Sequence, residues 1–236
     1  MTTIVFVGPT LRAAEVGARL PGARIEPPAA VGDVLRALRR RPARIAIVDG
    51  YFERMAAVWH KEILVALGRG VAVWGAASMG ALRAAELAPF GMIGVGAIYR
   101  AYARGALVAD DEVAVAHLPA EHGFRALSDA LVNLRFGLER AAAARVISPR
   151  TRDRLIELGR ARFYRERSWP QLHADGAAAG LPRDQLAALA AWPKPDRKAA
   201  DARRLLARLA RDRGRKPARL AVPRTWALRQ LEQLLE

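Results

Sequence analysis

The stretch GVAVWGAASMGALRAAEL, residues 70–87, decides the fold that the sequence predicts. Residues 71–74 form a short apolar run that follows two glycines, a pattern typical of a buried parallel strand. Residues 79–87 are good helix formers, and Ser78 stands where the strand turns sharply into the helix. The stretch therefore predicts a strand–turn–helix unit of an α/β domain.

Ser78 has two interpretations at this turn. The first amides of a helix have no acceptor within the helix, and the helix dipole favours negative charge there. A serine in this place acts as a nucleophile whose oxyanion is held by backbone amides, as in the G-x-S-x-G elbow of hydrolases. Ala76 replaces the first glycine of that motif. The alternative is that Ser78 only caps the helix.

Composition narrows the class of protein. The chain has 236 residues, of which 52% are hydrophobic, and it has no cysteine. This excludes disulfides, thiolate zinc sites and a cysteine nucleophile. No apolar run approaches the roughly 18 residues that span a bilayer. The N-terminus begins with a strand pattern rather than a positively charged leader, so we expect a soluble cytoplasmic protein.

Positive charge is concentrated in the second half of the chain. The net charge is +16, and residues 113–236 carry 25 Lys and Arg against 13 Asp and Glu. A basic terminal segment binds nucleic acid, an acidic partner protein or an anionic surface. The alternative is compositional drift, because arginine and alanine are abundant throughout the chain.

The periodicity of the chain predicts an α/β fold. Its N-terminal part is expected to be a Rossmann-like three-layer domain with a mostly parallel sheet, and its C-terminal region is expected to be all helical. Prolines at the boundaries of the apolar segments separate the predicted helices. The predicted strands are residues 3–7, 45–48, 71–74 and 113–116. The predicted domains are residues 1–122, a helical region over 123–192 and a basic helical segment over 193–236.

Asp49 and His60 are the candidate partners of Ser78. Asp49 follows the strand at residues 45–48, and in open α/β sheets ligands gather beyond the C-terminal strand ends. His60 begins the next helix, which starts at the same edge if the sheet is parallel. Asp, His and Ser meeting there would suit acyl transfer with His60 as general base. The alternatives are an Asx turn at Asp49, a capping role for His60, and Glu62 as the base.

Two further groups of polar residues have open roles. We expect residues 89–100 to form a glycine-rich loop over the site, with Tyr99 and Arg100 as polar contacts. Residues 110–112 are three consecutive acids, which would hold a hard cation such as Mg²⁺ or form a solvated loop. We favour the solvated loop and expect no metal and no cofactor. His117 is a second candidate base.

Four runs in this order resemble the TfuA-like protein family. The resemblance covers roughly residues 4–140, and the C-terminal helices add nothing to it. The runs are IVDGYFERMAAVWHKEIL at residues 47–64, GAASMGALRAAEL at 75–87, FGMIGVGAIYRAY at 90–102 and DDEVAVAH at 110–117.

The resemblance implies a partner of YcaO-type enzymes in peptide backbone thioamidation, where sulfur replaces an activated amide oxygen. Such a partner is associated with supplying sulfur, by releasing it from a thiocarboxylated sulfur-carrier protein or by recruiting the donor. A thiocarboxylate is an acyl compound, so Ser78 would attack it, with His60 as base and Asp49 orienting His60. The predicted substrate-binding residues are Met79, Gly80, Arg83, Glu86, Tyr99 and Arg100.

Three functions of different classes follow from these observations. The first is an enzyme that liberates sulfide for a YcaO enzyme through Ser78. The second is a non-catalytic adaptor that binds YcaO and its sulfur donor, with the basic helices supplying affinity. The third is a general nucleic-acid-binding protein, which rests on charge alone and lacks the exposed aromatics of single-strand binders. Arg83 has two candidate partners. It would pair with the thiocarboxylate of the sulfur donor, or with Glu86 within the chain.

Overall fold

In the computed structural model, five parallel strands form one sheet in the order β2-β1-β3-β4-β5. The structure describes residues 2–53, 55–212 and 222–234. The predicted α/β fold with a parallel sheet is therefore confirmed. This strand order belongs to the doubly wound folds, whose topological switch point lies between β1 and β3. The strands are β1 (Thr3–Phe6), β2 (Arg24–Glu26), β3 (Arg44–Ile47), β4 (Ala72–Ala76) and β5 (Ile93–Val95).

Two compact units make up the chain. The first comprises residues 1–108 and 199–236, and the second comprises residues 109–198. The domain boundaries predicted at residues 122 and 192 stay predictions. The two units of the structure change over after residues 108 and 198. Part of the predicted basic segment, residues 213–221, lies outside the described residues. No helix in the described part of the chain is long and apolar enough to cross a membrane.

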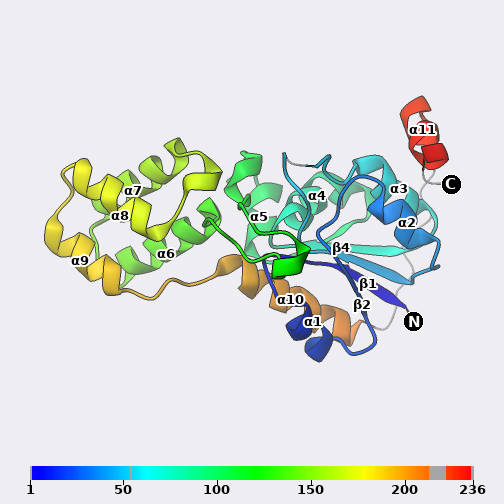
Figure 1. The fold of residues 1–236 in the computed structure, drawn as a ribbon, viewed down its shortest axis with the longest axis horizontal. Coiled ribbons are helices and arrows are strands. Elements are labelled where there is room, and N and C mark those ends of the chain that lie inside the picture. The colour runs from blue at the N-terminus through cyan, green and yellow to red at the C-terminus, as the bar shows by residue number, and fades with distance from the viewer. Residues whose placement is uncertain (1, 54, 213–221, 235–236) are drawn as a thin grey trace. The chain divides into compact units, whose positions relative to one another are not determined.

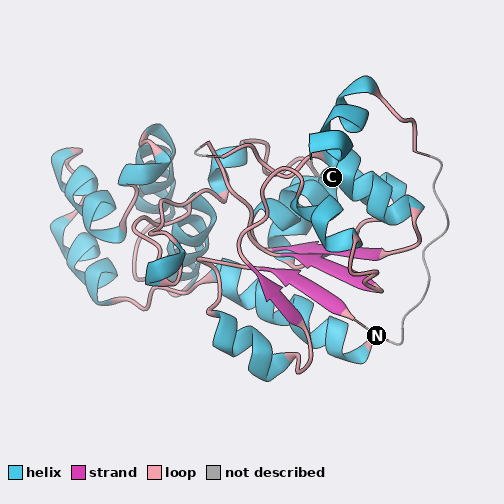
Figure 2. Cartoon of the chain, turned by 45° about the vertical axis from the view of Figure 1, so that its right-hand side comes forward, coloured by secondary structure: helices cyan, strands magenta, loops and turns pink. Residues whose placement is uncertain are grey.

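Helices cover both faces of the sheet in the first unit (Figures 1 and 2). On one face, α1 and α10 pack against side chains such as Val48 and Trp74. On the other face lie α3 and α4, with α2 against α3. The helices of this unit are α1 (Ala13–Arg19), α2 (Asp33–Leu38), α3 (His60–Gly68), α4 (Met79–Leu87), α5 (Ala97–Ala103), α10 (Arg197–Arg211) and α11 (Trp226–Leu234).

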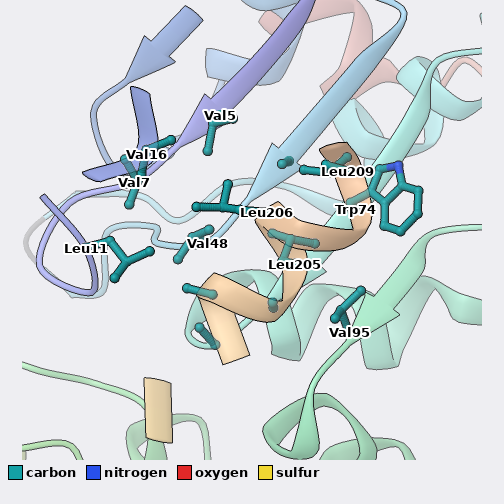
Figure 3. Close-up of a cluster of buried hydrophobic side chains, with 14 of the residues drawn as sticks. Val5, Val7, Leu11, Val16, Val48, Trp74, Val95, Leu205, Leu206 and Leu209 are labelled. Atoms are coloured by element: carbon teal, nitrogen blue, oxygen red, sulfur yellow. The ribbon is translucent and has the colours of Figure 1, made fainter. Parts of the chain in front are cut away.

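Helix α10 returns to the sheet after the second unit and completes its core. Leu205, Leu206 and Leu209 are fully buried against the strands (Figure 3). Burying a leucine stabilises a fold by about 1.5–3 kcal/mol, so these three side chains contribute strongly to the first unit. The sequence predicted a basic helical segment here, and the structure places the leucine face of α10 in the core.

The second unit is helical, as predicted for residues 123–192. Leucines such as Leu134, Leu155 and Leu172 form its own core. The Ser148 hydroxyl caps α7 by accepting a hydrogen bond from the Thr151 amide at 3.1 Å. The helices are α6 (Leu131–Ala143), α7 (Pro149–Ala161), α8 (Trp169–Ala178) and α9 (Arg183–Ala191), with short 3₁₀ turns at Asp110–Glu112, Ala120–His122 and Tyr164–Glu166.

The structure corrects two local predictions. Residues 113–116 form no strand, because Val113 and Ala114 are buried in the second unit without a neighbouring strand to pair with. Residues 89–100 are not one loop, since they contain β5 and the start of α5. Strand β5 pairs with β4 at the sheet edge, with Gly94 in register with Gly75.

Candidate functional site

Ser78 lies at the turn from β4 to α4, at the C-terminal edge of the sheet. Ala77, before it, has a positive φ of 67°, an uncommon conformation for a residue with a side chain. Ser78 is 7% exposed and occupies the N-cap position, yet its hydroxyl makes no capping hydrogen bond to the first turn of α4. The capping interpretation of Ser78 therefore has no support in the geometry.

Glycines hold this turn against two strands. A Cβ on Gly75 would lie 2.0 Å from the Gly80 carbonyl oxygen, and a Cβ on Gly80 would lie 1.7 Å from the Ile47 carbonyl oxygen. The first turn of α4 therefore contacts the backbones of β3 and β4 directly, which only glycine allows. The turn that carries Ser78 is fixed by backbone packing rather than by side chains.

Of the backbone amides in the first turn of α4, some donate hydrogen bonds within the fold and one is available to a ligand. The Gly80 amide donates to the Val48 carbonyl at 3.3 Å, so it is committed to the fold and cannot also hold an oxyanion. The Met79 amide makes no hydrogen bond to any of the described residues. Met79 itself is buried, with its side chain against Gly50. One backbone donor therefore remains beside Ser78.

Asp49 belongs to the topological switch point. Its carboxylate is 1% exposed and accepts hydrogen bonds from the amides of Gly8 and Thr10, at 2.9 and 3.0 Å, and from the Thr10 hydroxyl at 2.5 Å. In doubly wound folds a ligand binds in this crevice. Here the side chain of Asp49 satisfies the donors of the loop after β1.

His60 lies at the other end of α4 from Ser78. Its Nε2 is 2.8 Å from Oε2 of Glu86, which also accepts a hydrogen bond at 2.8 Å from Nη1 of Arg83. Arg83 in turn donates from Nε to the Val58 carbonyl at 3.0 Å. Glu86 follows Ser78 by eight residues, about 12 Å along a helix. The internal Arg83–Glu86 pair is therefore present, and the contacts of His60 lead away from Ser78.

The hydrogen bonds described for Asp49 and His60 go to groups other than Ser78, and the catalytic roles of all three residues stay predictions. Asp49 binds the loop after β1, His60 binds Glu86, and Ser78 stands at the start of α4. Glu62, the alternative base, is fully buried and accepts hydrogen bonds from the amides of Trp59, Gly32 and Val34. Burial raises the pKa of Glu62. Its three amide contacts make it a structural residue that joins α2 to α3.

Tyr99 and Arg100 lie at the start of α5. A Cβ on Gly94 would lie 2.1 Å from the Tyr99 ring, so the ring packs on the bare backbone of β5. Gly94 pairs in register with Gly75, which brings Tyr99 to the strand next to the one that leads to Ser78. Arg100 is exposed. Tyr99 therefore packs beside the C-terminal edge of the sheet, and Arg100 lies on the protein surface there.

Two of the three acids at residues 110–112 form ion pairs within the second unit, and Asp110 is exposed. Glu112 is buried and pairs with Arg135 at 2.7 Å, and Asp111 pairs with the buried Arg167 at 2.6 Å. No three His, Asp or Glu side chains among the described residues lie close enough together to hold a metal ion. His117, the second candidate base, lies in this unit with its Nδ1 2.8 Å from the Leu118 carbonyl oxygen.

Sequence reasoning missed the partners of the predicted residues. Gly8 and Thr10 form the donor loop for Asp49, and Glu86 binds His60. The turn Gly8-Pro9-Thr10 follows β1 as Asp49-Gly50 follows β3, so both emerge at one edge of a parallel sheet. This shared edge was the signal from which the contact between Asp49 and the Gly8–Thr10 turn could have been predicted. The sequence contains no such signal for the contact between His60 and Glu86.

The model of the family described as TfuA-like protein matches residues 49–168. The matched stretch begins at Asp49 and includes the Ser78 turn, His60, Glu86 and the start of α5. No curated protein matches the chain in a sequence comparison.

Proposed function

The chain belongs to the TfuA-like family, and from that premise we propose that it supplies sulfur to a YcaO enzyme in peptide backbone thioamidation. Family membership is consistent with an association with YcaO enzymes. The finer proposal is that the protein releases sulfide from a thiocarboxylated sulfur-carrier protein, with Ser78 as nucleophile. The supporting observation is the strand–turn–helix geometry at Ser78, with a positive φ at Ala77 and the Met79 amide beside it.

The proposed reaction needs no separate protein base in its first step. The Ser78 oxygen attacks the thiocarboxylate carbon, forming a C–O ester bond while the C–S bond breaks. The hydroxyl proton passes to the departing sulfur, so the products are an acyl ester on Ser78 and hydrosulfide. Water then hydrolyses the ester, releasing the carrier as its carboxylate with a proton and regenerating Ser78.

The neighbouring groups would serve this reaction by binding charge. A thiocarboxylate is anionic, and the unpaired amide at the start of α4 is a donor at the positive end of the helix dipole. As the tetrahedral intermediate forms, the Met79 amide would hold its oxyanion. Arg100 is exposed at the start of α5 and would attract the anionic tail. The roles predicted for His60 and Asp49 as base and orienter stay predictions without support from their hydrogen bonds.

The second candidate is the non-catalytic adaptor. It is favoured by the contact of His60 with Glu86, because that contact leaves His60 unavailable as the general base of Ser78. In this case the same edge would bind the carrier's C-terminal tail without cleaving it. The protein would then bring the loaded carrier to YcaO.

Sulfide release from a thiocarboxylated carrier protein separates these functions. The assay uses the full chain without YcaO and compares the native protein with Ser78→Ala. Ser128→Ala is the matched control, because Ser128 is equally buried, at 8% exposed, but lies in the second unit. The hydrolase predicts release by the native protein and the control, and none by Ser78→Ala. Absence of release by the native protein would refute the hydrolase and leave the adaptor.

A further inference from the structure

Packing of its leucines in the core decides which side of α10 faces solvent. Leu205, Leu206 and Leu209 are fully buried against the sheet, as Figure 3 shows for their contacts near Val48 and Trp74. The opposite side of the helix must therefore face solvent. It carries an arginine row, defined as Arg204, Arg208 and Arg211, all exposed.

The arginine row is not neutralised within the described residues, where none of its three members has an ion pair. The acids of this segment are used elsewhere. Asp201 is buried and accepts from the Ile98 amide at 2.8 Å, and Asp212 pairs with Arg44. Like charges at i, i+4 on a helix repel each other, so the row carries an electrostatic cost that a partner of opposite charge would relieve.

Glu15 of α1 is an acidic neighbour of α10 that pairs with an arginine outside the row. Arg203 pairs with Glu15 of α1 at 2.7 Å, which joins α10 to α1 on the same face of the sheet. Hydrogen bonds from Arg203 and Arg19 lower the pKa of Glu15 to about 2. Among the described residues, Glu15 pairs with Arg203 and Arg19, which both lie outside the row.

The shape of the face favours a protein partner. The exposed positions between the arginines are Ala207 and Ala210, so only short side chains lie between the charged ones. The row runs about 10.5 Å along the helix with charges about one turn apart, which matches carboxylates on a facing helix. The exposed face of α10 has no aromatic side chain on which a nucleic-acid base would stack.

We propose that the arginine row is the docking surface for an acidic face of the sulfur-carrier protein, an inference that rests on the proposed function. Helix α10, which carries the row, lies on the face of the sheet opposite α4 (Figure 1), so a carrier docked on it leaves the turn at Ser78 uncovered. The first turn of α10 reaches the C-terminal edge, where Asp201 holds the start of α5. The body of the carrier would bind along α10 while its flexible tail rounds that edge toward Arg100 and Ser78.

Binding of the carrier in its carboxylate form tests this surface without any chemistry. The full-length triple variant Arg204→Gln, Arg208→Gln, Arg211→Gln is compared with a control that removes equal charge from the second unit. The control substitutes glutamine at three exposed arginines of that unit, Arg150, Arg160 and Arg183.

We expect native binding that weakens with salt, a Kd raised roughly tenfold or more by the row variant, and a change within about twofold for the control. In the sulfide-release assay the row variant should raise KM and leave kcat unchanged.

Equal binding by the native protein and the row variant would overturn the proposal, as would a native chain that does not bind the carrier. Loss of binding to single-stranded RNA but not to the carrier would overturn it in favour of nucleic acid. Failure of sulfide release with carrier binding intact would instead count against the hydrolase alone.

Discussion

Replacing Asp49 with alanine should destabilise the loop after β1 rather than act on chemistry alone. The substitution removes the acceptor of three donors, namely the amides of Gly8 and Thr10 and the Thr10 hydroxyl. Each buried donor left unsatisfied costs about 1–3 kcal/mol, and relief from burying the carboxylate offsets part of that loss. We therefore expect a loss of about 3 kcal/mol in the free energy of unfolding of the first unit.

Hydrogen exchange read by mass spectrometry is the direct assay for this prediction. In Asp49→Ala the amides of Gly8 and Thr10 should exchange much faster, while amides of the second unit keep their native rates. Formate is close in size to the deleted carboxylate, so adding it should restore protection at those two amides, whereas chloride at equal ionic strength should not. Asp33→Ala is the control, because Asp33 is only half-buried and accepts from the single amide of Ala30.

One result would refute the reasoning about Asp49. If Asp49→Ala lost sulfide release while its exchange rates and stability matched the native protein, Asp49 would be an orienter of a catalytic base. The hydrogen bonds to the loop after β1 would then be incidental.

Three further substitutions probe packing, pH dependence and the acidic run. Gly80→Ala places a methyl group against the backbone of β3 and should cost about 3 kcal/mol or more, measured by chemical denaturation. Because the folded pKa of Glu15 is lowered to about 2, its pair with Arg203 stabilises the protein above about pH 4.5. That contribution is lost as the pH falls toward 2, so Glu15→Gln should reduce the acid sensitivity of stability by less than about 1 kcal/mol. Glu112→Gln should destabilise the second unit by about 3 kcal/mol by leaving Arg135 unpaired, and Mg²⁺ should stabilise neither protein.

Matched substitutions control these experiments. Gly17→Ala adds a methyl group that meets only the Ile25 side chain at 3.6 Å, so it should be neutral or slightly stabilising. Glu121→Gln alters an exposed acid of the second unit and should leave stability within about 0.5 kcal/mol of native. A Gly80→Ala protein as stable as Gly17→Ala would contradict the backbone packing at the Ser78 turn. Stabilisation by Mg²⁺ would contradict the ion pairs of the acidic run.

The fold followed from the sequence where strands are long and apolar. Strands β1, β3 and β4 are buried runs, and the turn at Ser78 connects β4 to its helix as the pattern predicted. Strands β2 and β5 have three residues each at the sheet edges, too few for a periodic signal. The apolar run at 113–116 misled because Val113 and Ala114 are buried without a strand beside them.

The site could be located from the sequence but not assembled. Parallel strands place Asp49 and Ser78 at one edge whatever their partners are. The direction of α4 decides that Glu86, rather than Ser78, reaches His60, and that direction depends on the contact between Gly80 and β3. No local pattern predicts a contact between backbones far apart in the sequence. The leucines of α10 likewise revealed an amphipathic helix without showing that the sheet covers them.

The measurement that tests the central claim most directly is mass spectrometry of the protein after brief mixing with a thiocarboxylated carrier and acid quenching. The account predicts an ester of the carrier's tail on the peptide that contains Ser78. It also predicts that the adduct is absent from Ser78→Ala and present in Ser128→Ala. Sulfide release without an adduct on Ser78, or an adduct on another residue, would contradict the claim that Ser78 is the nucleophile.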